Sequence, residues 1–302
     1  MEKYFWKHFL AERKYFWNQT FYRLMNKIIL KEKLDLELSL FSGQVFRWEK
    51  KLDWYYGFID NKFLKLRVKN NFLEYVCSDD LIAQNKIYDY FGLSIKYDEI
   101  FENFDDELSS IAYQKFRGMR VLNQDPWECL ISFIISAWSN VPKISNTLHL
   151  LCKKLGRKYT FDDMTGYSFP SPAQVVALTE FEMKSFGLGY RAKYILKTSK
   201  IIKDNKILLS DFYDKDYIDS LEFLLTFPGV GDKVANCVLI YSLKKYNAFP
   251  VDLWVERLLI EDYGLNKKMS LINKRKWGQN YFGRYSGIIQ HYLFHYKRKY
   301  NH

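Results

Sequence analysis

The alternation of hydrophobic and polar residues predicts a β-rich segment early in the chain. Leu64, Leu66 and Val68 alternate with the charged Lys65 and Arg67. This two-residue period is typical of a strand with one buried face and one exposed face. The segment therefore predicts a half-exposed antiparallel strand.

Two similar runs flank this strand and complete a meander. The predicted strands are Trp54–Ile59, Phe63–Val68 and Phe72–Cys77, and they are rich in aromatic and β-branched residues. Asp60-Asn61 and Asn70-Asn71 lie between them as turn signals. We interpret residues 36–77 as β-rich on this pattern.

After about residue 80 the apolar spacing becomes helical. Asp125 can cap a helix in which Pro126 takes the first position and Glu128 the third. Ser171 before a proline and Thr179 are further helix starts. No alternation of strands and helices of the βαβ kind is present, so the sequence predicts an α+β fold with an antiparallel part followed by a larger all-α part.

Three regions follow from these patterns. Residues 1–35 are predicted to be a helix-like, aromatic-rich N-terminal extension, which either packs as an extra helix or stays mobile. Residues 36–108 are predicted to form the antiparallel β domain, and residues 109–302 the helical region.

Charge points to a polyanionic partner. The 302 residues include 46 Lys and Arg against 35 Asp and Glu, a net charge of +11, and 48% are hydrophobic. That hydrophobic content excludes global disorder. The positive surplus favours nucleic acid over a membrane surface, although an ordinary basic protein has a similar balance.

Cysteine spacing and hydropathy exclude several other classes. The four cysteines form no C-x-x-C pair, so we expect buried thiols and no zinc or iron–sulfur site. No motif in the chain implies a metal or an organic cofactor, so we also expect no cofactor. No run reaches the roughly 18 apolar residues of a membrane span, and charges interrupt any signal-peptide core. These features predict a soluble intracellular monomer, in a prokaryotic cytoplasm, with no membrane partner.

The segment Leu224–Cys237 carries the most chemistry. An apolar helix is followed by the tight turn Pro228–Gly231 and a new helix beginning near Asp232. Glycines in the turn let the backbone approach a ligand, and the free N–H groups of a helix start bind phosphate oxygens. A plain αα-hairpin is the alternative interpretation.

Lys233 and Asp252 are candidate reacting groups. Lys233 lies at the start of the new helix, where a neutral amine would be a nucleophile, although most lysines are simply solvated. Asp252 precedes another helix and is interpreted first as its N-cap. A cap carboxylate near an amine could also stabilise a developing sugar cation.

Several ordered motifs resemble one family. Phe227–Lys233 (FPGVGDK) followed by Pro250–Asp252 resembles the helix-hairpin-helix–GPD superfamily of DNA glycosylases, and the lysine its bifunctional members. Ser42–Trp48, Gln124–Leu130 and Gly187–Ala192 are similar to segments of 8-oxoguanine DNA glycosylases of the eukaryotic type. The likeness runs from about residue 34 to about residue 296.

The resemblance implies an enzyme of base excision repair that acts on double-stranded DNA containing oxidised guanine. The target nucleotide would be flipped into a pocket between the β and helical domains. Lys233 would attack C1′, expel 8-oxoguanine and form a Schiff base, after which β-elimination cuts the strand. Asp252 would support the oxocarbenium-like transition state and proton movement.

The resemblance also implies how the base is recognised. The Gly43 carbonyl would accept the N7–H that 8-oxoguanine has and guanine lacks. Cys237 and Phe294 would sandwich the purine, and Gln290 would contact its Watson–Crick edge. Each of these three side chains could instead be an ordinary core or helix residue.

Further positions match DNA-contacting residues of the family. Tyr190 and Arg191 match the pair that wedges into the stack and contacts the orphaned cytosine, with a phosphate contact as the alternative for Arg191. The remaining expected DNA contacts are Trp138, Asn140, Lys143, Gly229, Val230, Gly231 and Trp254.

Three of these positions depart from the family. Trp138 stands where the family has the Asn that fills the gap left by the flipped base, and Lys143 replaces an Arg. An aromatic ring can stack in the gap but cannot read cytosine as an amide does, and lysine lacks bidentate geometry. Trp254 replaces a His near the catalytic Asp. A strict preference for cytosine opposite the lesion is therefore not expected.

Two alternatives remain open on the sequence. A glycosylase for another damaged purine is compatible with Trp138 and Trp254. A non-catalytic protein that binds damaged DNA through the hairpin alone would need neither Lys233 nor Asp252. The strength of the lyase step and a structural ion at the hairpin carbonyls are also left open.

Overall fold

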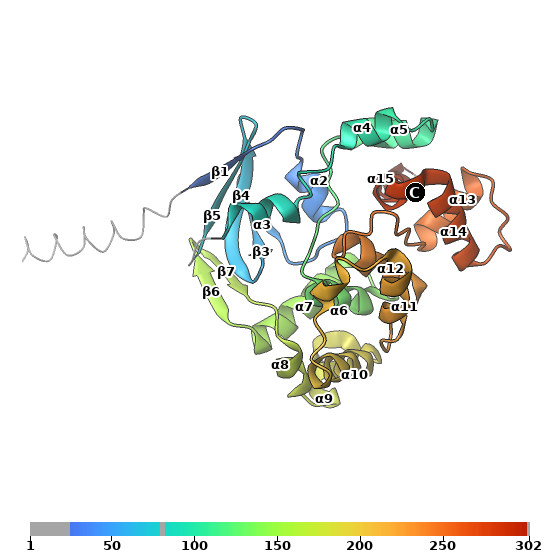
Figure 1. Cartoon of the computed structure of the whole chain (residues 1–302). Coiled ribbons are helices and arrows are strands. Elements are labelled where there is room, and N and C mark those ends of the chain that lie inside the picture. The colour runs from blue at the N-terminus through green and yellow to red at the C-terminus, as the bar shows by residue number, and fades with distance from the viewer. Residues whose placement is uncertain (1–24, 79–81, 301–302) are drawn as a thin grey trace, which may run out of the picture.

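The computed structural model describes residues 25–78 and 82–300 of the chain. An antiparallel sheet lies on one side of the molecule, and most of the helices lie on the other (Figure 1). The sheet has the order β1-β5-β4-β3-β2. Its strands are β1 (Asn26–Ile29), β2 (Glu49–Lys51), β3 (Trp54–Ile59), β4 (Lys62–Lys69) and β5 (Phe72–Cys77). The three strands of the predicted meander are confirmed.

Two short elements differ from the expectation. Asn26–Ile29 lies within the segment expected to be helix-like, but it is a strand that pairs with β5, with Ile28 opposite Leu73. Both side chains are buried, so the sheet core fixes this pairing. Leu36–Phe41, within the region expected to be β-rich, is helix α2, which Asp35 caps by accepting from the Leu38 N–H at 2.9 Å. The expected extension over residues 1–24 lies outside the described residues.

Helices follow the sheet, as the spacing predicted. They are α3 (Gln84–Tyr90), α4 (Tyr97–Glu102), α5 (Glu107–Lys115), α6 (Pro126–Ser136), α7 (Val141–Leu155), α8 (Pro172–Val176), α9 (Glu180–Met183), α10 (Arg191–Asp204), α11 (Tyr217–Leu225), α12 (Asp232–Tyr241), α13 (Leu253–Glu261), α14 (Leu271–Phe282) and α15 (Ser286–Tyr300). Three short helical turns are η1 (Lys184–Leu188), η2 (Leu209–Phe212) and η3 (Gly283–Tyr285). The predicted caps Asp125, Ser171 and Thr179 all accept a backbone N–H.

The helical region is not purely α-helical, contrary to the expectation. β6 (Lys158–Phe161) and β7 (Met164–Tyr167) form a two-stranded antiparallel hairpin. Phe161 of this hairpin is buried against Tyr56 and Phe63 of the main sheet. The hairpin therefore covers aromatic residues that the sheet would otherwise expose, a tertiary contact that helix-period analysis does not detect.

The main core lies among the helices. α6 and α12 pack against each other, and nearly every residue of both helices is buried. Apolar burial of this extent is the principal stabilising contribution in a domain of this kind. It also fixes the N-terminal end of α12, where the candidate nucleophile lies.

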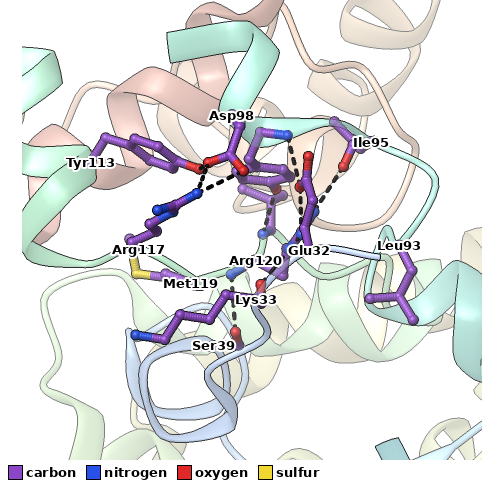
Figure 2. Close-up of polar contacts among 12 residues, drawn as sticks. Glu32, Lys33, Ser39, Leu93, Ile95, Asp98, Tyr113, Arg117, Met119 and Arg120 are labelled. Atoms are coloured by element: carbon purple, nitrogen blue, oxygen red, sulfur yellow. Dashed lines mark hydrogen bonds and ion pairs between the residues drawn. The ribbon is translucent and has the colours of Figure 1, made fainter. Parts of the chain in front are cut away.

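A buried ion pair joins the first described segment to the helical part (Figure 2). The Arg120 guanidinium donates to the Glu32 carboxylate at 2.7 Å and to the Ile95 carbonyl at 2.8 Å. It also lies over the Tyr97 ring, 4.4 Å from the centroid. The Arg120 N–H donates to the Ser39 hydroxyl at 2.9 Å, so the pair is also tied to α2.

Over residues 25–78 and 82–300, no helix has both the length and the apolar character that a membrane crossing requires.

Candidate active site

The turn between α11 and α12 has the geometry that the sequence predicted. Gly229 has φ +82°, and a Cβ there would lie 2.8 Å from the Tyr194 ring, so glycine is required on both grounds. Gly231 is the N-cap of α12 and supplies no side-chain cap. Val230 is buried and anchors the turn. The first N–H groups of α12 are therefore uncapped at an exposed glycine, an arrangement suited to an anion.

An ion pair holds the first turn of α12. The Arg275 guanidinium, from α14, donates to the two carboxylate oxygens of Asp232 at 3.0 and 3.1 Å. It also donates to the Tyr217 hydroxyl at 2.8 Å, which in turn donates to Asn236. Three helices thus converge on the residue that precedes Lys233.

Lys233 points from α12 toward the C-terminal end of α6. Its Nζ donates to the Ser136 hydroxyl at 3.3 Å and lies 5.1 Å from the centroid of the Phe133 ring. The side chain is partly buried. The amine therefore lies at the border between the apolar core and the loop that carries Trp138.

Asp252 is the N-cap of α13, as predicted. Its Oδ1 accepts from the Trp254 N–H at 3.0 Å and from the Val255 N–H at 2.9 Å. The other carboxylate oxygen is not used by the cap. The cap fixes the orientation of the carboxylate, so its free oxygen is held in place before any ligand binds.

Cys237 is close enough to both candidate reacting groups to feel their charges. It is one turn from Lys233, and both the Lys233 amine and the Asp252 carboxylate act on its thiol. Burial raises the pKa of the Cys237 thiol to about 11, against the opposing effect of Lys233. Cys237 is therefore a neutral thiol at neutral pH, and it suits a packing role rather than a nucleophilic one.

Neither Lys233 nor Asp252 forms an ion pair with any other residue in the described part of the chain. By contrast, the neighbouring Arg275 and Asp232 are paired with each other. Lys233 and Asp252 thus bring opposite charges near Cys237, and the Asp252 carboxylate also acts on the Arg298 guanidinium.

The Gly43 loop is fixed by a buried hydrogen-bond network. Gly43 has φ +98°. The Gln44 amide donates to the Ser39 carbonyl and to the Arg120 carbonyl, both at 2.8 Å, and its oxygen accepts from the Leu122 N–H at 2.8 Å. The Glu32–Arg120 pair of Figure 2 is therefore connected directly to this loop.

His291 supports the same loop from α15. Its ring nitrogens lie 3.2 Å from the Ser42 hydroxyl and 3.0 Å from the Tyr241 hydroxyl. Burial, with the neighbouring His295 and Arg298, lowers the pKa of His291 to about 3, so the ring is neutral at physiological pH. A neutral ring can accept one of these hydrogen bonds and donate the other.

One face of α15 carries the predicted base-binding residues. Gln290 is buried, and its amide donates to the Pro250 carbonyl at 3.1 Å. Its Oε1 has no hydrogen-bond partner among the described residues. Phe294 lies one turn later and Arg298 another turn later, with the guanidinium 5.3 Å from the centroid of the Phe294 ring. A buried acceptor without a partner is uncommon and marks a position where a donor is expected.

A second group of predicted residues lies on the loop after α6. Trp138 is 96% exposed and has φ +53°. Arg191 donates to the carbonyl oxygens of Ala137 and Trp138, the latter at 3.1 Å. The large aromatic side chain is thus presented to solvent on a backbone that Arg191 holds.

The other predicted DNA-contacting residues surround this loop. Asn140 caps α7 by accepting from the Lys143 N–H at 3.1 Å, and both side chains are exposed. Tyr190 is 54% exposed, and the Arg191 guanidinium lies over its ring, 4.8 Å from the centroid. Trp254 is apart from them, on the first turn of α13 beside Asp252.

The predicted residues lie on two sets of elements. The first set comprises the loop after α2, α12, the start of α13 and α15, which carry Gly43, Lys233, Cys237, Asp252, Gln290 and Phe294. The second, around Trp138, consists of Trp138, Asn140, Lys143, Tyr190 and Arg191. The contact of Lys233 with Ser136 connects them.

Sequence reasoning did not find three residues of the site. Arg275, His291 and Arg298 lie outside every motif that was singled out. The only available signal was that His291 and Arg298 follow Gln290 and Phe294 on one helix.

A separate cavity of about 320 Å³ lies elsewhere, between the sheet, α7 and the β6–β7 hairpin. Arg47, His149 and Tyr167 are among the residues that line it, and no predicted catalytic residue does. Arg47 is paired with Glu128 at 2.6 Å and donates to the Tyr167 carbonyl, so the Arg47 guanidinium already has hydrogen-bond partners within the protein. The predicted reacting groups Lys233 and Asp252 therefore lie outside this cavity.

Within the described ranges, no cluster of three or more His, Cys, Asp or Glu side chains could hold a metal ion. The expectation of an enzyme without a cofactor stays a prediction.

Known proteins are similar to this chain in sequence. Residues 27–130 match the N-terminal domain of 8-oxoguanine DNA glycosylase, and residues 131–278 match the HhH-GPD superfamily of base excision DNA repair proteins. The N-glycosylase/DNA lyase of Saccharomyces cerevisiae is 32% identical over 275 residues, which cover 81% of this chain and 72% of that protein.

Solved structures agree. The 8-oxoguanine glycosylase/lyase of Clostridium acetobutylicum, in its apo-form, has a TM-score of 0.84 and 31% identity, over 90% of this chain and 96% of that one. The complex of that enzyme with double-stranded DNA containing cytosine opposite 8-oxoguanine has a TM-score of 0.83 and 31% identity, over 90% and 94% of the two chains.

Fold, hairpin and site together define a DNA repair protein of the helix-hairpin-helix class. The chain belongs to the 8-oxoguanine DNA glycosylase family of the HhH-GPD superfamily, and it is a DNA N-glycosylase with lyase activity.

Proposed function

We propose that this enzyme excises 8-oxoguanine from double-stranded DNA and cuts the strand through a covalent intermediate on Lys233. One observation carries the proposal. Lys233 and Asp252 bear opposite charges, neither is ion-paired within the described residues, and both act on the same buried thiol of Cys237. Such an arrangement suits an amine nucleophile and a carboxylate that stabilises positive charge.

The chemical steps place each group. Lys233 first gives up its ammonium proton, and the amine then attacks C1′ as the C1′–N9 bond breaks. The base leaves with the bonding electrons and takes up one proton from the attached nitrogen. The C1′–O4′ bond then opens, O4′ takes up the second proton, and a Schiff base forms between C1′ and the lysine nitrogen. Removal of a C2′ proton then expels the 3′ phosphate, and water releases Lys233. The fixed Asp252 carboxylate stabilises the positive charge that develops on the sugar.

The base would be bound by the residues around Cys237. The Gly43 carbonyl accepts the N7–H that distinguishes 8-oxoguanine from guanine, and Gln290 Oε1 accepts from the Watson–Crick edge. Cys237 and Phe294 pack on the two faces of the ring. The buried Gln290 acceptor without a partner supports this assignment, because a purine N–H would satisfy it.

The exposed ring of Trp138 would fill the gap that the flipped nucleotide leaves, and Tyr190 would wedge beside it. Asn140, Lys143, Arg191, Trp254 and the backbone at Gly229, Val230 and Gly231 would contact the remaining DNA. Because stacking does not depend on base identity, we expect little preference for cytosine opposite the lesion. The enzyme would act as a monomer.

Borohydride trapping tests the proposal. The protein is incubated with a duplex that carries one 8-oxoguanine opposite each of the four bases, and the Schiff base is reduced. We expect a covalent adduct that disappears in Lys233→Gln and persists in Lys96→Gln, which changes the exposed N-cap residue of α4 that is paired with Glu99. Base release that survives Lys233→Gln would contradict the mechanism. Trapping only with another damaged purine would instead favour the alternative substrate.

A further inference from the structure

Arg298 projects toward the Gly43 loop from the last turns of α15. A Cβ built on Gly43 would lie 3.3 Å from Arg298 Nη1. The guanidinium also lies 5.3 Å from the centroid of the Phe294 ring. It therefore lies next to two of the groups that surround the candidate base site.

The guanidinium has no hydrogen-bond acceptor among the described residues. Arg298 forms no hydrogen bond or ion pair with any residue of the described ranges, whereas Arg47, Arg120 and Arg275 are each bound to a carboxylate. Burial lowers the pKa of Arg298, and the nearby Asp252 carboxylate opposes this effect. The donors of this partly buried guanidinium are therefore available to a ligand that offers an acceptor.

Helical spacing places Arg298 on the same face of α15 as Gln290, about two turns further along the helix. The two residues are eight positions apart, which is about 12 Å along the axis of α15. Phe294 lies midway between them. If Gln290 contacts the Watson–Crick edge of a purine stacked on Phe294, then Arg298 faces the other end of the ring, beside Gly43.

The chemistry of that end selects the partner. A guanidinium only donates hydrogen bonds, so it needs an acceptor. An 8-oxopurine has N7–H and the O8 oxygen side by side, whereas guanine has an acceptor at N7 and no oxygen at C8. The Gly43 carbonyl and the Arg298 guanidinium form a matching acceptor and donor.

We propose that Arg298 is a specificity-determining residue that donates a hydrogen bond to O8 of the flipped 8-oxopurine. The inference rests on the proposed function. It adds a second hydrogen bond that recognises the lesion to the one that the Gly43 carbonyl would form. It assigns the substrate class as purines with both N7–H and O8, which offer a donor to Gly43 and an acceptor to Arg298 side by side.

Single-turnover rates test the contact. Base release from an 8-oxoguanine duplex and strand cleavage at an abasic site are measured in the same preparations of wild type, Arg298→Leu and Arg298→Lys. An abasic site has no base, so a contact to O8 cannot contribute there. We expect Arg298→Leu to slow base release by about 10- to 100-fold. Its effect on the rate of abasic cleavage should be smaller than its effect on base release by a factor of at least ten. The rate of base release in Arg298→Lys should lie between those of Arg298→Leu and the wild type.

Lys299→Leu is the matched control, because it removes an adjacent positive charge from the same helix. It should change the two rates equally, and only slightly. Equal losses of both rates in Arg298→Leu would assign Arg298 to the DNA backbone or to the fold. Unchanged base release in that variant would also overturn the inference.

Binding separates this inference from the proposed function. In the Lys233→Gln background, affinity is compared for duplexes with 8-oxoguanine and with guanine at the same position. A preference for 8-oxoguanine that Arg298→Leu reduces at least tenfold supports the O8 contact even if the wild type releases no base. A preference that Arg298→Leu leaves unchanged, or no preference at all, would overturn it.

Discussion

The Arg275 guanidinium donates to the Asp232 carboxylate at 3.0 Å, directly beside the candidate nucleophile Lys233. Arg275 is buried and comes from α14, 43 residues further along the chain. The pair therefore fixes the start of α12 relative to the C-terminal helices. It orients Lys233 without touching it.

Removal of Arg275 should disturb both stability and chemistry. In Arg275→Met the Asp232 carboxylate loses its counter-charge, and we expect a loss of about 2 to 4 kcal/mol in the free energy of unfolding. Trapping by borohydride should also slow, because the first turn of α12 is less rigid. Denaturant titration and adduct formation measure the two effects. Arg284→Met, an exposed arginine, is the control, and equal behaviour of the two variants would contradict the anchoring role.

The Glu32–Arg120 pair of Figure 2 should contribute strongly to stability. Glu32→Gln leaves Arg120, which is 2% exposed, without its negative partner. We expect a loss of about 3 to 5 kcal/mol, measured by denaturant titration. The control is Glu99→Gln, which breaks the exposed pair with Lys96 and should cost less than about 1 kcal/mol. Similar losses in the two variants would show that burial is not the cause.

Trp138 should supply affinity without sequence preference. In a Lys233→Gln background, Trp138→Ala should weaken binding to a lesion duplex by about 1 to 3 kcal/mol, whichever base is opposite, because one stacking contact is lost. Trp138→Asn should restore a preference for cytosine, since an amide reads base edges. Affinities across the four opposite bases measure both. Leu208→Ala, another exposed apolar side chain, should have no effect, and a cytosine preference already present in the wild type would contradict the assignment.

Acid should destabilise the protein through His291. Its pKa of about 3 in the folded state lies below the ordinary value near 6.5, so the unfolded chain binds a proton first. The stability contribution is full above pH 6.5 and is lost as the pH falls toward 3, by up to about 1.4 kcal/mol per pH unit. Tyr241, Ser42, Gln44, His295 and Arg298 are the polar and charged groups around the ring.

His291→Gln isolates this contribution. The free energy of unfolding is measured between pH 7 and pH 4 for both proteins. We expect a shallower slope in the variant, although it is less stable at pH 7 because the Ser42 and Tyr241 contacts change. Parallel slopes would mean that His291 does not titrate on unfolding.

Local signals made much of the site predictable. Asp252 and Asp125 were identified as N-caps because a cap depends on a few neighbouring residues, and the structure confirms both. The Pro228–Gly231 turn was predictable because its glycines signal a tight turn, and the positive φ at Gly229 agrees with this. The β3–β5 meander was readable because short turns and two-residue alternation are also local.

Contacts between segments that are distant in the chain could not be predicted from the sequence. β1 needs β5 as its partner, and the β6–β7 hairpin needs the aromatic face of the main sheet, so each element was missed. Arg275, His291 and Arg298 acquire their positions only when α14 and α15 pack near α12 and the Gly43 loop.

The sequence by itself determined the α+β class, the hairpin, the helix caps and the identity of the candidate reacting groups, because turns, caps and strand alternation are set by neighbours along the chain. Only the tertiary structure decided that Lys233 and Asp252 lie near Cys237 without ion pairs, and that Arg298 faces Gly43. The physical reason is that burial and charge pairing depend on which helix faces meet. Those faces are selected by the packing of the whole core, and no short window of sequence contains that information.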